Sequence, residues 1–298
     1  MKKFVFALIL ILLVSGCSGM PDLSGLIPGT KTVNKTELSE DLVVIQNMKV
    51  IPSPPLNAGD KFSVFFELKN QDELKTITVN WKNFDYGLCS PLNTPRASSG
   101  SVSLAPLQTE FMEWSFNAPS NEQIAYLTNK CPIRFKITYN YKTTSQIDAS
   151  VMSDARYIEL QKSGNPPSYT PNLVVGRGPI KTYMSFGAAL PVRSGSSLPI
   201  FITVEDKGTG MLSSIPAGAL TLNFNGISVN CGDRFNDCSS GTCTNKEIPI
   251  IQKKTSILRC SLTAPTVDPE KTYYFTASLD YNYELELQID VTVKPLPT

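Results

Sequence analysis

The reactive side chains of this sequence restrict its chemistry, because the chain contains seven cysteines and no histidine. Without histidine it cannot form a Ser-His-Asp or Cys-His nucleophilic site, a His-ligated zinc site or an imidazole general base. The sequence also contains no Ser-x-x-Lys and no Gly-x-Ser-x-Gly motif. A pair of carboxylates, as in an envelope glycan hydrolase, is the route to catalysis that remains. We therefore predict no catalytic residue and a protein that is not an enzyme.

Cys17 is the first cysteine, and its surroundings indicate a lipid attachment site. A positive start, Met1-Lys2-Lys3, precedes an apolar run over residues 4–14, which is shorter than the roughly 20 residues needed to span a bilayer. The run ends in Leu-Val-Ser-Gly-Cys, which resembles the lipobox of prokaryotic lipoproteins. This resemblance implies a signal peptide over residues 1–16 and a lipid on Cys17. The alternative is a cysteine that merely follows an ordinary secretory cleavage site.

Residues 17–40 follow the leader and contain Gly, Pro, Ser, Thr and charged residues with no helical or strand period. This pattern predicts a lipidated flexible tether. Asn34 begins the sequon Asn-Lys-Thr within it, so Asn34 is a possible glycosylation site.

The six other cysteines are an even number, which in an oxidising compartment indicates disulfides. Cys89 and Cys131 are alone in the first half of the chain, and we expect them to pair. In the second half we favour Cys231–Cys260 inside the core and Cys238–Cys243 closing a small loop, although two other connectivities are possible.

Two metal sites are alternatives for the same loop, and we predict neither. A four-cysteine zinc site lacks the close Cys-x-x-Cys pairs that such sites usually use. Calcium could bind Asp233, Asn236 and Asp237, but their spacing does not fit a calcium loop, and polar residues are common in any turn. We predict no metal and no cofactor.

The sequence contains a divergent internal repeat, and its strands must position the cysteines described above. Residues alternate between buried and exposed types in the second matched pair, as expected of strands with one buried face. The five matches, in chain order, are 41–44 with 172–175, 59–68 with 195–204, 78–81 with 221–224, 114–119 with 260–265, and 139–151 with 281–293.

The repeat predicts two domains, over residues 41–161 and 172–298. The segment 162–171, Lys-Ser-Gly-Asn-Pro-Pro-Ser-Tyr-Thr-Pro, separates them as a proline-rich linker. Each copy holds about seven strand candidates and no convincing helical period, which is typical of an immunoglobulin-like β-sandwich. We therefore predict an all-β chain of two tandem sandwiches.

The last match contains Tyr139-Asn140-Tyr141 and Tyr281-Asn282-Tyr283. These tyrosines could stack against a sugar, but they continue the buried parity of their strands, so we favour core packing. The strand pattern and this Tyr-x-Tyr motif resemble the CARDB-type immunoglobulin-like modules repeated in archaeal and bacterial surface proteins. The resemblance implies adhesion, display or spacing at the cell surface, and it transfers no catalytic residue.

The charge balance bears on the partners of this chain. Lys and Arg total 27 and Asp and Glu total 26, which gives no electrostatic reason to expect nucleic acid. We expect a lipid-anchored protein on the cell surface or the extracytoplasmic face of the membrane, with an unknown surface protein or glycan as partner. The loop from Cys231 to Cys243 is the candidate contact surface. A protein-binding subunit of a larger envelope complex is the main alternative.

Lipidation of Cys17 predicts that Cys17→Ser moves the protein from the membrane fraction to the soluble fraction. Stable anchoring takes about two lipid signals, which a lipid-modified terminus supplies and serine does not. Fractionation followed by immunoblotting measures the change, and Ser18→Ala is the matched control that should stay with the membrane. Equal retention of Cys17→Ser would contradict the anchor.

Overall fold

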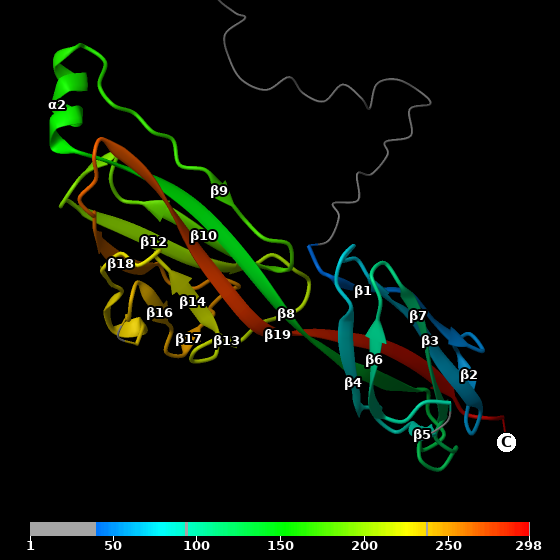
Figure 1. Ribbon diagram of the computed structural model, residues 1–298. Helices are drawn as coiled ribbons and strands as arrows, with labels where there is room; N and C mark the ends of the chain where they lie inside the picture. Colours follow the sequence, from blue (N-terminus) through cyan, green and yellow to red (C-terminus); the bar gives the residue numbers. More distant parts are fainter. Residues whose placement is uncertain (1–39, 93–94, 237, 298) are drawn as a thin grey trace, which may run out of the picture. The chain divides into compact units, whose positions relative to one another are not determined.

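The computed structural model describes residues 40–297 apart from residues 93–94 and 237 (Figure 1). The predicted signal peptide, Cys17, Asn34 and nearly all of the tether lie outside the described residues. The described residues form one compact unit. Among the described helices, none has the length and apolar character required to cross a bilayer.

Strands dominate the described chain, which confirms the all-β prediction. Each repeat contributes one four-stranded sheet of its own. In the first repeat the order is β1 (Val43–Ile51), β3 (Lys61–Asn70), β7 (Thr109–Asn117) and β5 (Ser90–Leu92). In the second repeat it is β10 (Ile180–Phe186), β12 (Ser197–Asp206), β18 (Leu258–Thr263) and β15 (Val229–Asn230).

A third, nine-stranded sheet runs through both repeats. Its main order is β16 (Thr242–Thr244), β14 (Leu220–Asn223), β19 (Glu270–Lys294), β8 (Asn129–Met152), β4 (Ile77–Asp85) and β6 (Ser99–Leu104). Short strands join its edges: β2 (Leu56–Asn57) pairs with β19, whereas β9 (Leu173–Val174) and β11 (Val192–Arg193) pair with β8. A separate pair is formed by β13 (Ser214–Ile215) and β17 (Ile248–Pro249).

The cores follow from the alternation in the sequence. In β3 the buried positions alternate with less buried ones, and β12 has the same pattern, because alternate side chains of a strand point to opposite faces. The buried face of β7 presents Trp114, whose ring lies 4.5 Å from that of Phe135 on β8. This contact joins the two sheets of the first sandwich. In the second, Phe186 of β10 and Phe275 of β19 lie 6.1 Å apart.

The two longest strands, β8 and β19, contain 24 and 25 residues and pair antiparallel from Asn129↔Val293 to Met152↔Glu270. In the first repeat β8 lies between β4 and β19, and in the second β19 lies between β14 and β8. Each repeat therefore receives a strand from the other. Figure 1 shows the two strands, green and red, side by side along their length.

This exchange is symmetric in register. Asn140 pairs with Asn282, and Tyr139 and Tyr141 pair with Tyr283 and Tyr281. Because the two Tyr-Asn-Tyr motifs are equivalent by sequence, equivalent residues lie opposite each other, as they would across a two-fold axis. The short strands obey the same relation, since β2 pairs in parallel with the end of β19 and β11 pairs in parallel with the end of β8.

One sequence match is wrong in register. Val43 pairs with Asn70 and Ile180 pairs with Asp206, so the structural counterpart of Val43 is Ile180. The segment Leu173–Val174, which the sequence aligned with the start of β1, instead forms β9 on β8. The first residues of the second repeat therefore belong to the nine-stranded sheet.

A short helix, α2 (Asp154–Lys162), lies where no helix was predicted. Ser153 caps it by accepting a hydrogen bond from the amide of Arg156. Asp154 in the first turn and Lys162 in the last turn suit the helix dipole. None of its residues is buried, so the sequence carries no amphipathic period that would reveal it.

The six cysteines of the described chain lie in pairs at bonding distance. The Sγ–Sγ distances are 2.20 Å for Cys89–Cys131, 2.05 Å for Cys231–Cys260 and 1.95 Å for Cys238–Cys243. The first pair closes a loop with a sequence separation of 42 residues. In the loop-entropy model such a bridge stabilises the folded state by about 4 kcal/mol.

The exchanged strands predict that the first repeat cannot fold as a monomer by itself. Residues 40–162 alone should aggregate or form a dimer in which β8 of each copy replaces β19 of the other, because an uncovered β8 leaves an edge in the middle of the sheet. The matched variant joins residues 40–140 to residues 282–297 through an Asn-Gly turn. It should be a folded monomer by light scattering and thermal unfolding. A folded monomer of residues 40–162 would contradict the exchange.

Candidate binding groove and buried tyrosine cluster

Four tyrosines gather where the repeats exchange strands: Tyr139, Tyr141, Tyr281 and Tyr283. All are buried, with exposed fractions of 0%, 7%, 2% and 0%. The ring centroids of Tyr139 and Tyr283 lie 5.6 Å apart, and those of Tyr141 and Tyr281 lie 6.3 Å apart. This confirms core packing as the role of the four rings, because a sugar-stacking platform would have to expose a ring face.

Two buried aspartates accept hydrogen bonds from this cluster. Tyr141 Oη donates to Asp72 Oδ2 at 2.7 Å, and Tyr283 Oη donates to Asp206 Oδ1 at 2.8 Å. Asp72 lies two residues after the end of β3, and Asp206 is the last residue of β12. The loop after each strand is thus tied to the exchanged strand of the same repeat. A buried carboxylate needs such donors.

The two carboxyl groups differ in their pKa. Burial raises the pKa of Asp206, and the hydrogen bonds from Tyr283 and from the Gly208 amide only partly offset it. Burial also acts to raise the pKa of Asp72, but Tyr141 and the amides of Leu74 and Lys75 donate to the carboxylate and hold its pKa below the usual value. At Asp72 the three donors and the charge of Lys75 together outweigh burial, whereas at Asp206 burial outweighs two donors and the charge of Lys253.

Burial also raises the pKa of all four tyrosines. The hydroxyls of Tyr139 and Tyr281 have no hydrogen-bond partner of standard geometry in the described chain. The amides of Leu42 and Val43, and of Ile180, nevertheless lie close enough to lower these pKa values in part. The cluster consists of neutral phenols that fill a core, and two of them donate to carboxylates, which is a structural role.

Asp41 links the first repeat to the second. Its carboxylate accepts hydrogen bonds from the Thr209 amide, at 2.9 Å to Oδ2, and from Thr209 Oγ1 at 2.6 Å. The neighbouring Glu40 forms a 2.8 Å ion pair with Lys181 on β10. These contacts fasten the entry into β1 to the loop after β12 and to the edge strand of the second repeat.

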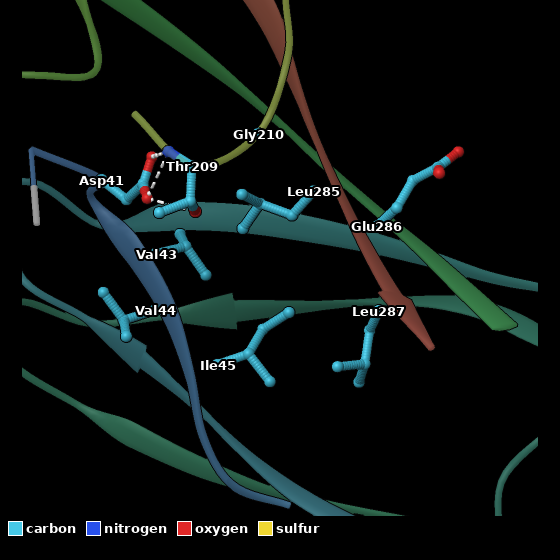
Figure 2. A pocket seen from close by; sticks show the side chains of 9 residues that line it. All are labelled: Asp41, Val43, Val44, Ile45, Thr209, Gly210, Leu285, Glu286 and Leu287. Atoms are coloured by element: carbon cyan, nitrogen blue, oxygen red, sulfur yellow. Dashed lines mark hydrogen bonds between the residues drawn. The ribbon is translucent and has the colours of Figure 1, made fainter. Parts of the chain in front are cut away.

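A groove of about 310 Å³ begins at Asp41 and Thr209. It lies between β1 and β19, which are edge strands of their two sheets at this point. Figure 2 shows Leu285 and Leu287 of β19 facing β1, with the Asp41–Thr209 hydrogen bonds at one end and Glu286 pointing away. The lining residues are Asp41, Val43, Val44, Ile45, Thr209, Gly210, Leu285, Glu286 and Leu287.

The sequence does not reveal this groove, because its two walls are about 240 positions apart and come together only through the strand exchange. The alternation Leu285, Leu287, Ile289 is the available signal, and it indicates only a buried strand face. The predicted contact surface, the loop from Cys231 to Cys243, instead adjoins a separate recess of about 260 Å³.

The metal alternatives for that loop can be placed on the structure. The Sγ atoms of Cys231, Cys238 and Cys243 lie within 4.8 Å of one another, but as disulfides they are not the thiolates that zinc requires. Asn236 Nδ2 donates to Thr244 Oγ1 at 3.1 Å, and Asp237 lies outside the described residues. That the loop binds no metal stays a prediction.

No protein-family model matches this chain, and no curated protein matches it. Among solved structures, a mutant of oxalate decarboxylase from Bacillus subtilis is 7% identical, with a TM-score of 0.12 over 92% of this chain and 87% of that chain. The same enzyme at pH 4.6 is 8% identical, with a TM-score of 0.12 over 92% and 86%. Likenesses this weak carry no argument about the fold or activity of this chain.

The opposite pKa shifts predict opposite pH effects for two matched substitutions. The lowered pKa of Asp72 stabilises the fold above its unfolded pKa of about 4, and this stabilisation is lost as the pH falls through the folded pKa. Asp72→Asn should therefore lower the free energy of unfolding by about 1–3 kcal/mol at pH 7 and by less near pH 3. The raised pKa of Asp206 stabilises the fold below its unfolded pKa of about 4, and this stabilisation is lost as the pH rises through the folded pKa.

The free energy of unfolding of Asp206→Asn, relative to that of the parent, should accordingly increase from pH 3 to neutral pH. Asparagine also suits the site, because Asn70 occupies the equivalent end of β3 and accepts from the amide of Asp72 as Asp206 accepts from Gly208. Urea unfolding across this pH range measures both variants. The same pH trend in both would refute this account of the two carboxylates.

Proposed function

We propose that this chain is a non-catalytic, lipid-anchored surface protein that acts in adhesion, display or envelope structure through its two immunoglobulin-like sandwiches. The observation that carries the proposal is the antiparallel ladder of β8 and β19, which runs through both repeats. The two sandwiches cannot separate into independent domains without breaking the hydrogen bonds of this ladder. That suits a protein that holds a binding surface at a fixed place outside the cell.

The alternative of a protein-binding subunit in a larger envelope assembly is supported by the groove between β1 and β19. The groove is apolar on its walls and lies between two strand edges, which are features of surfaces that take up extended polypeptide. A carboxylate-based glycan hydrolase is less well supported. Asp41, Asp72 and Asp206 are buried and engaged in hydrogen bonds to Thr209 and to tyrosines.

The proposal predicts that the protein and its neighbours lie outside the membrane. A membrane-impermeant biotin reagent applied to intact producing cells should label the lysines of the protein, and a peroxidase fused after residue 298 should label surface proteins. Cys17→Ser should release the fusion into the medium and abolish that labelling. Labelling of cytoplasmic proteins, or cleavage of envelope glycans by the purified protein, would overturn the proposal.

A further inference from the structure

The outer edge of β19 between Leu285 and Thr292 is uncovered within the part of the chain that the structure describes. Met211 pairs with Glu284 before this stretch, and β2 pairs with Val293 and Lys294 after it. The Met211 amide donates to Glu284 O at 2.8 Å, and the Glu284 amide donates to Met211 O at 3.2 Å. Because backbone groups alternate along a strand, every second amide and carbonyl beyond Glu284 also faces this edge.

The equivalent edge in the second repeat is covered by an extended segment. There β9 pairs antiparallel with β8, Val174 with Gln146 and Leu173 with Ile147. The adjoining amide of Asn172 donates to Asp148 Oδ1 at 2.7 Å. The two-fold relation of the repeats makes Gln146, Ile147 and Asp148 the counterparts of residues 288–290 on β19. The fold itself thus shows what an edge at this position binds.

The uncovered edge presents apolar side chains. Leu287 and Ile289 are half-buried and pack against the core with Ile45 of β1. Their counterparts on β8, Ser145 and Ile147, are 1% and 2% exposed beneath the covering segment. The edge that lacks a covering strand therefore has more apolar surface to bury than the edge that has one.

Charge adds a second requirement on the occupant. Glu286 and Asp290 are exposed on the outer face of β19. Neither forms an ion pair with another described residue, and Asp290 Oδ1 accepts a hydrogen bond from Gln288 Nε2 at 2.9 Å. The nearby cations are already engaged: Lys136 pairs with Glu284 at 2.7 Å, and Arg134 Nε donates to Gln288 Oε1 at 3.0 Å. A strand added here would place alternate side chains beside these two carboxylates, which have no cationic partner among the described residues.

We propose that the edge of β19 from Leu285 to Thr292 binds an extended segment of a partner polypeptide as an additional antiparallel strand. The segment alternates apolar residues, which enter the groove of Figure 2, with Lys or Arg, which face Glu286 and Asp290. This inference rests on the proposed function, since the partner would be an extracytoplasmic protein. Its main-chain hydrogen bonds supply affinity and its alternation supplies specificity.

The test uses the mature chain carrying Cys17→Ser and a fluorescent nine-residue peptide of alternating valine and lysine. Anisotropy should show saturable binding with one peptide per chain. Methylating the alternate peptide amides that face β19 should weaken binding at least tenfold, as should replacing the lysines with glutamates. A methylated peptide that binds as tightly as its parent would overturn strand addition.

Substitutions on the protein locate the site. Leu287→Lys and Ile289→Lys should each weaken binding at least tenfold, because an inward charge blocks edge pairing. Leu127→Lys is the matched control, since Leu127 is 68% exposed and lies outside the groove. Circular dichroism and thermal unfolding check that each variant is folded. If both groove variants are folded and bind unchanged, the edge is not the site.

Amide hydrogen exchange separates the partner from the chain's own N-terminal segment. The peptide should slow exchange at Glu286, Gln288 and Asp290 but not at Leu287, whose amide faces β8. If these amides are already slow and become fast in a chain that begins at residue 39, residues 18–38 cover the edge and the proposal fails. Surface labelling and membrane retention do not depend on this result, so the failure of either idea is distinguishable.

Discussion

The ladder between β8 and β19 is the constraint on which the rest of the structure depends. It pairs residues 129–152 with residues 270–293, and it supplies each sandwich with a strand that its own repeat does not encode. The sheets of both cores, the tyrosine cluster and the groove all exist because these two strands run past each other. A shift of one residue in their register would turn every buried side chain of both strands to the opposite face. The alternation of large apolar and polar residues along 24 positions therefore fixes the register strongly.

Near the midpoint of this ladder two aspartates, Asp72 and Asp206, are buried beside the tyrosine cluster. Tyr141 and Tyr283 each combine an apolar ring, which packs in the core, with a hydroxyl that donates to Asp72 or Asp206. The same carboxylates accept backbone amides of the loops after β3 and β12, so each loop is positioned by the long strand of its own repeat, which continues into the sheet of the other repeat. A buried hydrogen bond of this kind is favourable only when donor and acceptor are both present, so each loop and the tyrosine that holds it depend on each other.

The sequence predicted what depends on local pattern and missed what depends on pairing. The alternation in 59–68 and 195–204 predicts two equivalent strands, and β3 and β12 confirm them. The Tyr-Asn-Tyr motifs predict buried strand positions, but a period of two does not state which strand lies alongside. An exchange and a hairpin within one repeat satisfy the same pattern. The match of residues 172–175 with residues 41–44 was wrong for a related reason, since Leu-Val-Val is compatible with any strand and does not identify its partner. The groove could not be predicted because its two walls come together only through the strand exchange.

The exchanged strand also sets the order in which the protein can fold. The first sandwich needs the last part of β19, and the second needs the end of β8 together with the first part of β19. Neither core can close until the C-terminal thirty or so residues are present, although the first sandwich begins at residue 43. Under the export proposed above, a chain threaded across a membrane from its N-terminus would stay unfolded until translocation is nearly finished. Its native contacts are correspondingly non-local, which slows folding.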